Sequence, residues 1–370
     1  MKKILFVMGV MAASASALAD VEVAAGVKLY GVLDQSVQTQ TLSDPNSATA
    51  GQKYVGMYAA GATSRLGVRG ERELGSGTKA HIQIELEIKP DKPKGGVVNT
   101  TANRGTFVGL EGTAGTVRLG TQETMAYETF AMDANGRAEY KPQLWRLTQT
   151  KGDSNSQGDR AGNSVKYITP SFEGFTVHAL VGLGESSTLG YQSLAIKYQQ
   201  DKTKAAVIRD ITSNAYGSMC TPGTNCTDGV AYDGGTAGSS LVWGGSSTTK
   251  VYRNVAAASY DFGPLAVNYI YAKAYTITKA GSLSTHTVGL RMPVDQITFA
   301  MSYGAGTLDS YYSSGSYARD ATLSDTTLGA YYAFDKSTSA YFLGSVTTIG
   351  SQTVQAGSVK TASIGLQYKF

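Results

Sequence analysis

The residues best placed to act chemically are charged side chains on one face of alternating segments. Arg65, Arg118 and Lys166 each stand opposite in parity to their apolar neighbours, and Glu85 has the same placement in the segment after Arg65. Alternate side chains of a β-strand point to opposite faces, so these charges belong to the face that is not apolar. Fixed charges of this kind attract or repel ions, and they need no nucleophile or acid to do so.

Signals for catalysis are weak. His81, His178 and His286 stand singly in distant segments, which favours polar wall groups over a metal site. The sequence contains no G-x-S-x-G, H-E-x-x-H or nucleotide-loop motif. We therefore expect no enzyme activity, no cofactor and no bound metal. The alternative is a barrel enzyme in which His178 or His286 is the base, and it needs a Ser or Asp partner that no motif marks.

The composition indicates an all-β fold. The chain has 370 residues, among them 44 glycines and 23 tyrosines, and 16% of its residues are charged. A typical globular protein has about 25% charged residues and about 7% glycine. After the first twenty residues no long apolar run occurs, and the i, i+3, i+4 spacing of helices is hard to find. Strands with one apolar face fit this pattern.

The C-terminal segment 358–370 shows the strand pattern most clearly. It reads SVKTASIGLQYKF, in which one face ends in Ile, Leu, Tyr and Phe and the other carries small and polar residues. One face therefore suits hydrocarbon and the other suits water. Similar alternation occurs in 27–36, 64–70 and 79–89.

Short turns and long polar connections alternate along the chain. Seven short turns are predicted near 71–77, 111–115, 170–174, 199–203, 261–264, 292–295 and 334–337. Eight long connections are predicted near 37–61, 90–103, 121–162, 184–190, 213–251, 275–283, 306–324 and 349–357. Together they join sixteen strands and place both termini at the turn end. An even strand number with turns on one side and loops on the other is typical of outer-membrane barrels. We predict a 16-stranded antiparallel transmembrane β-barrel with a lumen wide enough for water.

The N-terminus has the features of a secretory signal. A basic start precedes the apolar run 4–11, and small residues follow up to Ala19. The apolar run is too short to span a membrane, so 1–19 is predicted to be a signal peptide and 20–370 the barrel. Without the two lysines of the signal, 30 of the 32 Lys and Arg residues remain against 28 Asp and Glu. This nearly neutral balance does not suggest a nucleic-acid partner.

The chain has two cysteines, Cys220 and Cys226, in a stretch rich in Gly, Thr and Asn. Export leads to a compartment in which disulfides form. A small disulfide-bonded loop is therefore predicted, since a metal site would need further ligands.

The connection 121–160 is too apolar for a solvated outer loop. Its large apolar residues are Met125, Tyr127, Phe130, Met132, Leu144, Trp145 and Leu147. Folded into the barrel, it would bury these residues, narrow the lumen and present the acids Glu123, Glu128 and Asp133. The alternative is a compact external cap. Long loops in compact folds are usually functional, which favours the inward position.

Several motifs are spread over the mature chain. They are LYGVLD in the opening strand, SRLGVRG-E-x-LGSG-x-KA, the NRGTFVGLEG–GTVRLG hairpin, the NSVKY strand and the terminal aromatic residue. Each piece alone is weak, but the combination is specific. Over its whole mature length the chain resembles the trimeric sixteen-stranded general porins of Gram-negative β-proteobacteria.

The resemblance implies roles for further residues. In that family the third loop folds into the pore, and arginines on the wall face acids there. Arg65 and Arg104 match the first two wall arginines, although apolar residues share the parity of Arg104. Arg160 matches the third arginine, and Glu85 matches the acid beside the first. The terminal Phe370 matches the residue that the barrel-assembly machinery reads.

The function expected from these observations is passive diffusion of small hydrophilic solutes and ions across the cell outer membrane, with a preference for anions. The predicted constriction residues are Arg65, Arg104, Arg118, Arg160, Lys166, Glu85, Glu123, Glu128 and Asp133. The alternative for each of them is a solvated lumen residue without a special role. The expected partners are a homotrimer, outer-membrane lipid and lipopolysaccharide, the barrel-assembly machinery, and the solutes and anions. An adhesin or receptor that acts through its outer loops is the other alternative.

Overall fold

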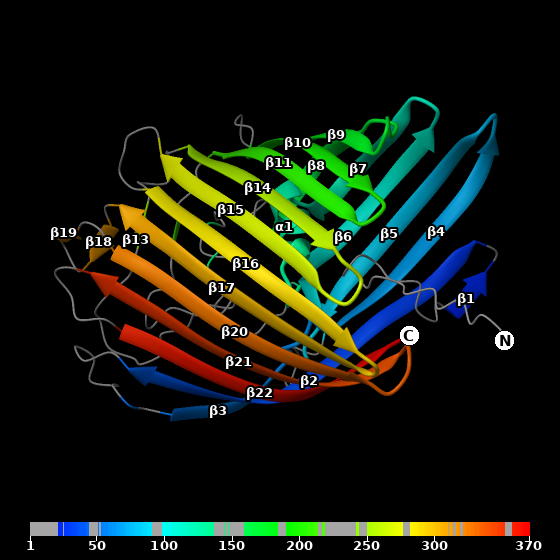
Figure 1. The fold of residues 1–370 in the computed structure, drawn as a ribbon. Helices are drawn as coiled ribbons and strands as arrows, with labels where there is room; N and C mark the ends of the chain where they lie inside the picture. The colour runs from blue at the N-terminus through cyan, green and yellow to red at the C-terminus, as the bar shows by residue number, and fades with distance from the viewer. Residues whose placement is uncertain are drawn as a thin grey trace.

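A ring of sixteen antiparallel strands closes on itself in the computed structural model (Figure 1). The first long strand, β2 (Val27–Ser43), pairs with the last, β22 (Gly357–Lys369), and also with β4 (Arg65–Gly75). The residues described are 21–24, 26–43, 51, 53–90, 98–136, 144, 148, 159–183, 190–213, 217–218, 242–243, 250–276, 282–309, 311–313, 316–318, 321–351 and 357–370. The predicted 16-stranded barrel is confirmed.

The other strands follow in chain order around the ring. They are β5 (Thr78–Ile88), β6 (Val98–Gly112), β7 (Gly115–Glu123), β8 (Arg160–Ile168), β9 (Phe175–Gly182), β10 (Tyr191–Gln200), β11 (Thr203–Thr212), β14 (Val251–Asp261), β15 (Ala266–Thr276), β16 (Ser282–Val294), β17 (Ile297–Asp309), β20 (Ala321–Ala333) and β21 (Thr338–Ser351). The short strands β1 (Val21–Ala24) and β3 (Lys53–Tyr58) pair along β2. A separate small sheet contains β12 (Gly217–Ser218), β13 (Val242–Trp243), β18 (Tyr311–Ser313) and β19 (Ser316–Ala318).

Each of the seven predicted short turns falls where one strand ends and the next begins, at the end of the barrel that also holds the C-terminus (Figure 1). The turns near 71–77 and 292–295 are shorter than predicted, because β4 continues to Gly75 and β16 to Val294. The predicted connections 37–61 and 90–103 were wrong in part. In the first, β2 continues to Ser43 and β3 follows at Lys53–Tyr58, and in the second, β6 already begins at Val98. The polar sequence of 37–61 does not indicate strands. They form because this part of β2 pairs with β22 on one side and with β3 on the other.

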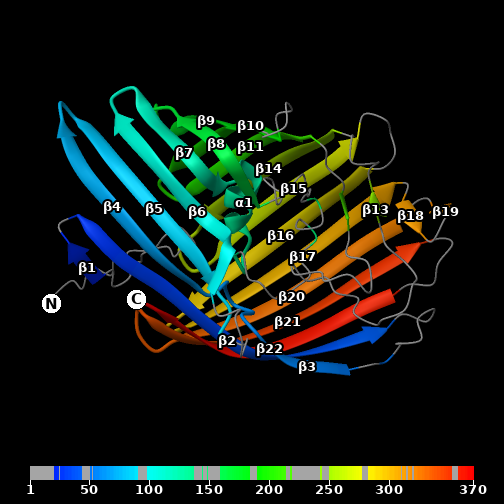
Figure 2. The same ribbon diagram turned by 180° about the vertical axis from the view of Figure 1, so that it is seen from behind.

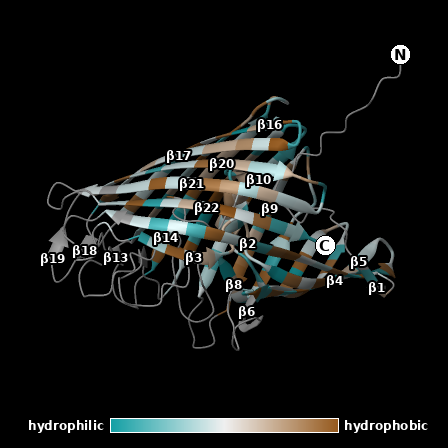
Figure 3. Ribbon diagram, turned by 90° about the horizontal axis from the view of Figure 1, so that it is seen from below, coloured by the Kyte–Doolittle hydropathy of each residue, from teal (hydrophilic) through white to brown (hydrophobic). Residues whose placement is uncertain are grey.

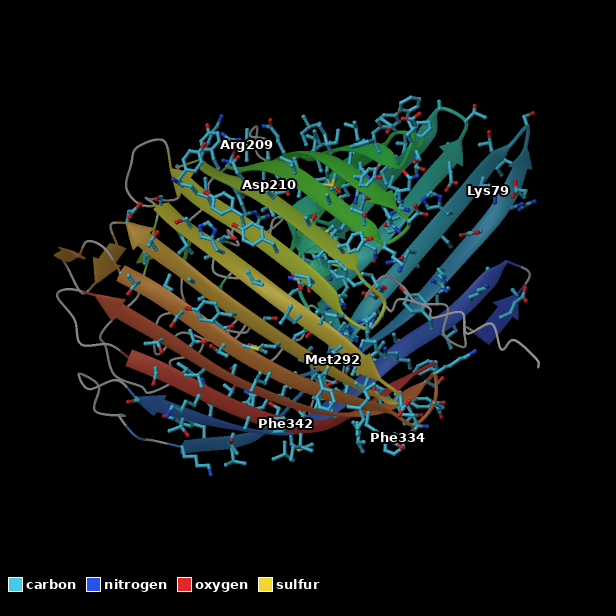
Figure 4. The ribbon with its side chains drawn as sticks, in the orientation of Figure 1. Lys79, Arg209, Asp210, Met292, Phe334 and Phe342 are labelled. Carbon is cyan, nitrogen blue, oxygen red and sulfur yellow. The ribbon has the colours of Figure 1, made fainter. Side chains whose placement is uncertain are left out.

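The two faces of the sheet differ in polarity, as the alternating colours along the strands show (Figure 3). Outward-facing Val207, Ile364 and Leu366 are 64%, 68% and 61% exposed, whereas inward-facing Asp34 and Thr327 are fully buried. Three further outward side chains, Met292, Phe334 and Phe342, are labelled in Figure 4. So large an apolar outer surface requires hydrocarbon around it. Within the described residues, no helix has the length and apolarity to cross a membrane.

The C-terminal residue closes the ring. The backbone of Phe370 exchanges two hydrogen bonds with Gly31 on β2, at 2.8 and 3.1 Å. A Cβ atom at Gly31 would lie 2.4 Å from the Phe370 ring, so only glycine lets this ring lie across β2.

A short helical segment lies inside the ring in both opposite views (Figures 1 and 2). It consists of α1 (Met125–Thr129) and η1 (Phe130–Met132) and follows β7. The Thr124 hydroxyl accepts a hydrogen bond from the backbone N–H of Tyr127 at 3.4 Å and so caps α1.

The inner wall buries the apolar side of this segment. Met125, Ala126 and Phe130 are fully buried. They belong to one cluster with inward-facing wall residues that include Leu180, Ala195, Ile208, Val255 and Ile270. Burial of a side chain as large as Met or Phe stabilises by about 1.5–3 kcal/mol. The predicted inward fold of this connection is therefore confirmed over 124–136.

Candidate functional site

Glu85 on β5 holds together the first group of charged side chains. Its carboxylate lies 3.4 Å from Nε of Arg65 on β4 and 2.9 Å from Nε of Arg104 on β6. The Tyr30 hydroxyl donates to the same carboxylate at 3.0 Å. Two guanidinium groups contact one carboxylate, so these four residues together carry one surplus positive charge. We call these four residues the Glu85 cluster.

Arg104 reaches Glu85 because the ladder between β5 and β6 contains a bulge. Glu85 pairs with Gly105, but the next pair is Leu86 with Asn103, so Arg104 is an extra residue. A bulge reverses the side-chain parity on either side of it. Arg104 therefore faces inward, although Val108 on the same nominal parity faces outward and is 51% exposed.

Arg160, the first residue of β8, packs directly against this cluster. Its Nε donates to the backbone carbonyl of Arg104, and its Nη2 lies 3.1 Å from Glu123. Its Nη1 lies 3.4 Å from the Asp159 carboxylate, and its Cζ lies 4.7 Å from the centroid of the Tyr127 ring. The two acids and the ring together hold a buried guanidinium in place. The three arginines therefore follow one another along the wall from β4 to β8.

Glu128 ties α1 to the wall. Its carboxylate accepts from Nζ of Lys197 on β10 at 2.6 Å and from Nζ of Lys166 on β8. Burial alone would raise the pKa of Glu128, but the two ammonium groups outweigh it and hold that pKa well below its usual range. We call these three residues the Glu128 clamp. Like the Glu85 cluster, it contains two cations and one carboxylate.

The other end of the helical segment is bound to the far side of the ring. The Ser302 hydroxyl of β17 donates to Asp133 at 2.8 Å and accepts from the Asn135 amide at 3.0 Å. Arg291 of β16 donates to the carbonyl of Ala134 at 2.9 Å. The segment therefore crosses the interior from the β8–β10 wall to the β16–β17 wall, with a polar anchor at each end.

The model of the Gram-negative porin family matches residues 7–348. The chain belongs to the Gram-negative porins. Outer membrane porin protein 32 of Delftia acidovorans is 31% identical over 252 residues, which cover 64% of this chain and 67% of that protein. The major outer membrane protein P.IB of Neisseria gonorrhoeae is 29% identical over 181 residues, 48% of this chain and 47% of that protein.

Solved porin structures share the fold. The anion-selective porin from Comamonas acidovorans superimposes with a TM-score of 0.70 at 21% identity, covering 93% of this chain and 99% of that one. OmpT of Vibrio cholerae in its trimer form gives a TM-score of 0.61 at 14% identity over 93% and 99%. The resemblance seen in the sequence is thus confirmed. This porin is an outer-membrane channel protein of a Gram-negative bacterium and not an enzyme.

The porin brings most of the nine predicted constriction residues together, but in separate groups. Arg65, Arg104 and Glu85 form the first cluster, and Arg160 and Glu123 the next. The acids of the inward segment do not form one row facing the arginines. Glu123 contacts Arg160 directly, Glu128 is held by lysines, and Asp133 is only 4% exposed against β17. Asp133 therefore anchors the segment instead of lining open lumen.

Arg118 stands apart from these acids. Its Nε donates to Nε2 of His81 at 3.1 Å, and its Cζ lies 4.8 Å from the centroid of the Phe107 ring. Within the described parts of the chain, no carboxylate lies within 4.0 Å of it. A histidine and an aromatic face replace the acid partner that the other arginines have.

Sequence reasoning missed several residues that hold the site. They are Tyr30, Lys197, Asn135, Arg291 and Ser302. Inward parity was the available signal for Tyr30 and Lys197. Parity could not show that Ser302 meets Asp133, because the two are far apart in the sequence. The predicted signal peptide, 1–19, and the predicted disulfide between Cys220 and Cys226 lie outside the described residues.

Acidification to about pH 4 should leave the Glu128 clamp intact. Because the folded-state pKa of Glu128 is lowered, the stability that it contributes is present above the unfolded value of 4.5 and is lost only as the pH falls through the lower folded value. Single-channel noise should therefore be similar at about pH 7 and about pH 4. A sharp rise in noise with a midpoint near the ordinary glutamate pKa would contradict the clamp.

Proposed function

We propose that this porin passes small hydrophilic solutes by diffusion and prefers anions. The supporting observation is the charge ratio on the wall from β4 to β10. Among the described residues, the clusters above hold six cations, Arg65, Arg104, Arg118, Arg160, Lys166 and Lys197, and four carboxylates, Glu85, Glu123, Glu128 and Asp159. The surplus is positive although the whole chain is almost neutral.

The mechanism requires only the electrostatic field of the charged wall residues and a lumen of suitable width. The inward segment lies inside the barrel and packs against its inner wall, so it narrows the path of permeating ions. A unit charge at about 6 Å contributes roughly 0.7 kcal/mol in water, which changes the local concentration of an ion about threefold. An anion gains by this amount for each surplus charge and a cation loses by it. The Comamonas porin that shares this fold is described as anion-selective, which agrees with the proposal.

The decisive experiment is a reversal potential measured across a planar bilayer in a KCl gradient. The surplus positive charge predicts a reversal potential whose sign indicates selectivity for chloride, with a permeability ratio of Cl⁻ to K⁺ above one. A reversal potential of the opposite sign, which means selectivity for potassium, would show that the half-buried carboxylates Glu123 and Asp159 dominate, and the proposal would then be wrong.

We propose in addition that three copies assemble. The OmpT structure is described in a trimer form, and large apolar side chains such as Val207, Ile364 and Leu366 are exposed on the outer face of this barrel. Assembly predicts conductance insertions that close in three equal steps under voltage. Closure in a single step of full amplitude would indicate a monomer.

A further inference from the structure

Arg209 is a cation on the lipid-facing side of the barrel. It follows the outward parity of Val207 on β11, whereas its neighbour Asp210 is buried inside, and Figure 4 shows Arg209 at the outer surface. A lipid-facing arginine is unfavourable at the bilayer midplane and close to neutral near the interface. The depth of Arg209 therefore decides what it can do.

The aromatic residues of β14 mark that depth. Tyr260, which packs on Phe262 at 4.6 Å, lies at the turn end, and Tyr252 lies on the same face eight residues away. Eight residues extend about 26 Å along a strand, or about 20 Å along the membrane normal at the usual tilt, which approaches the ~25 Å height of the apolar band. Arg209 lies 4.8 Å from the Tyr252 ring, so it stands at the far edge of the band. The long connections between strands begin at this edge of the apolar band, and in bacterial barrels they lie on the extracellular side.

The guanidinium of Arg209 is held in place by uncharged side chains. Its Nη1 donates to Oδ1 of Asn254 at 2.6 Å and to the Tyr275 hydroxyl at 2.7 Å. Its Cζ also faces the Tyr275 ring at 5.5 Å, and the rings of Tyr252 and Tyr275 stack at 5.7 Å. These contacts occupy one of its three nitrogens. No carboxylate of the described residues lies within 4.0 Å of it.

A second cation stands beside it on the same face. Lys273 on β15 pairs with Asn254, and Asn254 pairs with Arg209, so the two cations are two strands apart. Two strand spacings amount to about 10 Å, which lets both side chains reach one phosphate group. Among the described residues, the acid nearest to them on this face by strand pairing is Asp309. It lies two strands beyond Tyr275 and accepts a hydrogen bond from the Ser282 hydroxyl at 2.8 Å.

We propose that Arg209, Asn254 and Lys273 bind a phosphate of the lipid A headgroup of lipopolysaccharide in the outer leaflet. The planar fork of the guanidinium matches phosphate oxygens, and the ammonium group adds a second charge. The stacked tyrosines lie at the level of the headgroup, as aromatic residues at membrane interfaces do. The acyl chains lie below, along Val207 and Ala256, which share this outer face. The site is independent of the lumen and of ion preference.

The test compares lipid binding by the intact porin and two variants. Purified protein in detergent is titrated with diphosphoryl lipid A, and bound lipid is counted by native mass spectrometry. R209Q/K273Q should weaken binding by at least about tenfold, because the loss of even one charge-assisted hydrogen bond has an effect of about that size. The matched control is K360Q, because Lys360 is an exposed outward cation near the same end of β22, where its ladder partners are Thr41 and Val346. It should bind like the wild type.

Four results would overturn the proposal. They are equal affinity for lipid A without phosphates, an equal loss in K360Q, displacement of lipid A by equimolar inorganic phosphate, and a changed oligomeric state in R209Q/K273Q with unchanged lipid affinity. The last would assign this face to a second copy of the chain. Unchanged single-channel conductance of R209Q/K273Q shows that the variant is folded and keeps this test separate from the proposed anion preference.

Discussion

Replacing Arg65 and Arg104 together by glutamine should lower the chloride-over-potassium permeability ratio by about tenfold. The variant changes the Glu85 cluster from a surplus positive charge to a net negative one, with Glu85 still held by Tyr30. Two charges at about 6 Å act on the anion and the cation in opposite directions, and counterions screen each of them over a Debye length of about 10 Å at 0.1 M salt. The measurement is the reversal potential in a KCl gradient.

The control is the triple variant R65Q/R104Q/E85Q. It removes the leftover carboxylate, so its permeability ratio should lie between those of the wild type and the double variant. E85Q alone should raise the ratio above the wild type, because both guanidinium groups then lack their shared acid. A double variant whose ratio stays within about twofold of the wild type, less than one charge at ~6 Å would give, would show that these arginines do not set the preference.

Strand periodicity made the barrel predictable from the sequence. Alternation such as that of 358–370 is a local property, and each hairpin brings its neighbour into register. Turns such as 334–337 follow from short polar breaks between alternating runs. The inward position of α1 was predictable for a different reason, since Met125 and Phe130 had to leave water and packing against the inner wall of the barrel could bury them.

The details of the charged site were less predictable, because they depend on contacts between distant segments. The bulge that turns Arg104 inward arises from the pairing of β5 with β6, and the parity of β6 alone gives the opposite answer. Nothing in the sequence shows that Ser302, on β17, reaches Asp133 across the ring and that Asp133 is buried there. Alternation gives each side chain a face, but it does not say which charges on that face will meet.

Breaking the Glu128 clamp should loosen the inward segment and make the open channel noisy. In E128Q the side chain of Lys166, only 2% exposed, loses its acid and stays beside Lys197. Removing one partner of a fully buried pair costs about 3–5 kcal/mol, and the partial exposure of Glu128 and Lys197 lowers that figure to about half. The far anchor at Ser302 and the apolar cluster remain. We therefore expect frequent substates of larger conductance and not an unfolded barrel.

K197Q provides the matched comparison, because it leaves Glu128 and Lys166 as a one-to-one pair. Its traces should be nearly as quiet as those of the wild type, although it removes as much charge from the lumen as E128Q does. The channel noise therefore reports whether the Glu128 clamp holds the inward segment, and the reversal potential reports the net charge of the wall. If E128Q were as quiet as K197Q, the apolar contacts of Met125 and Phe130 alone would hold the segment, and the two lysines would serve only the electrostatics of the wall.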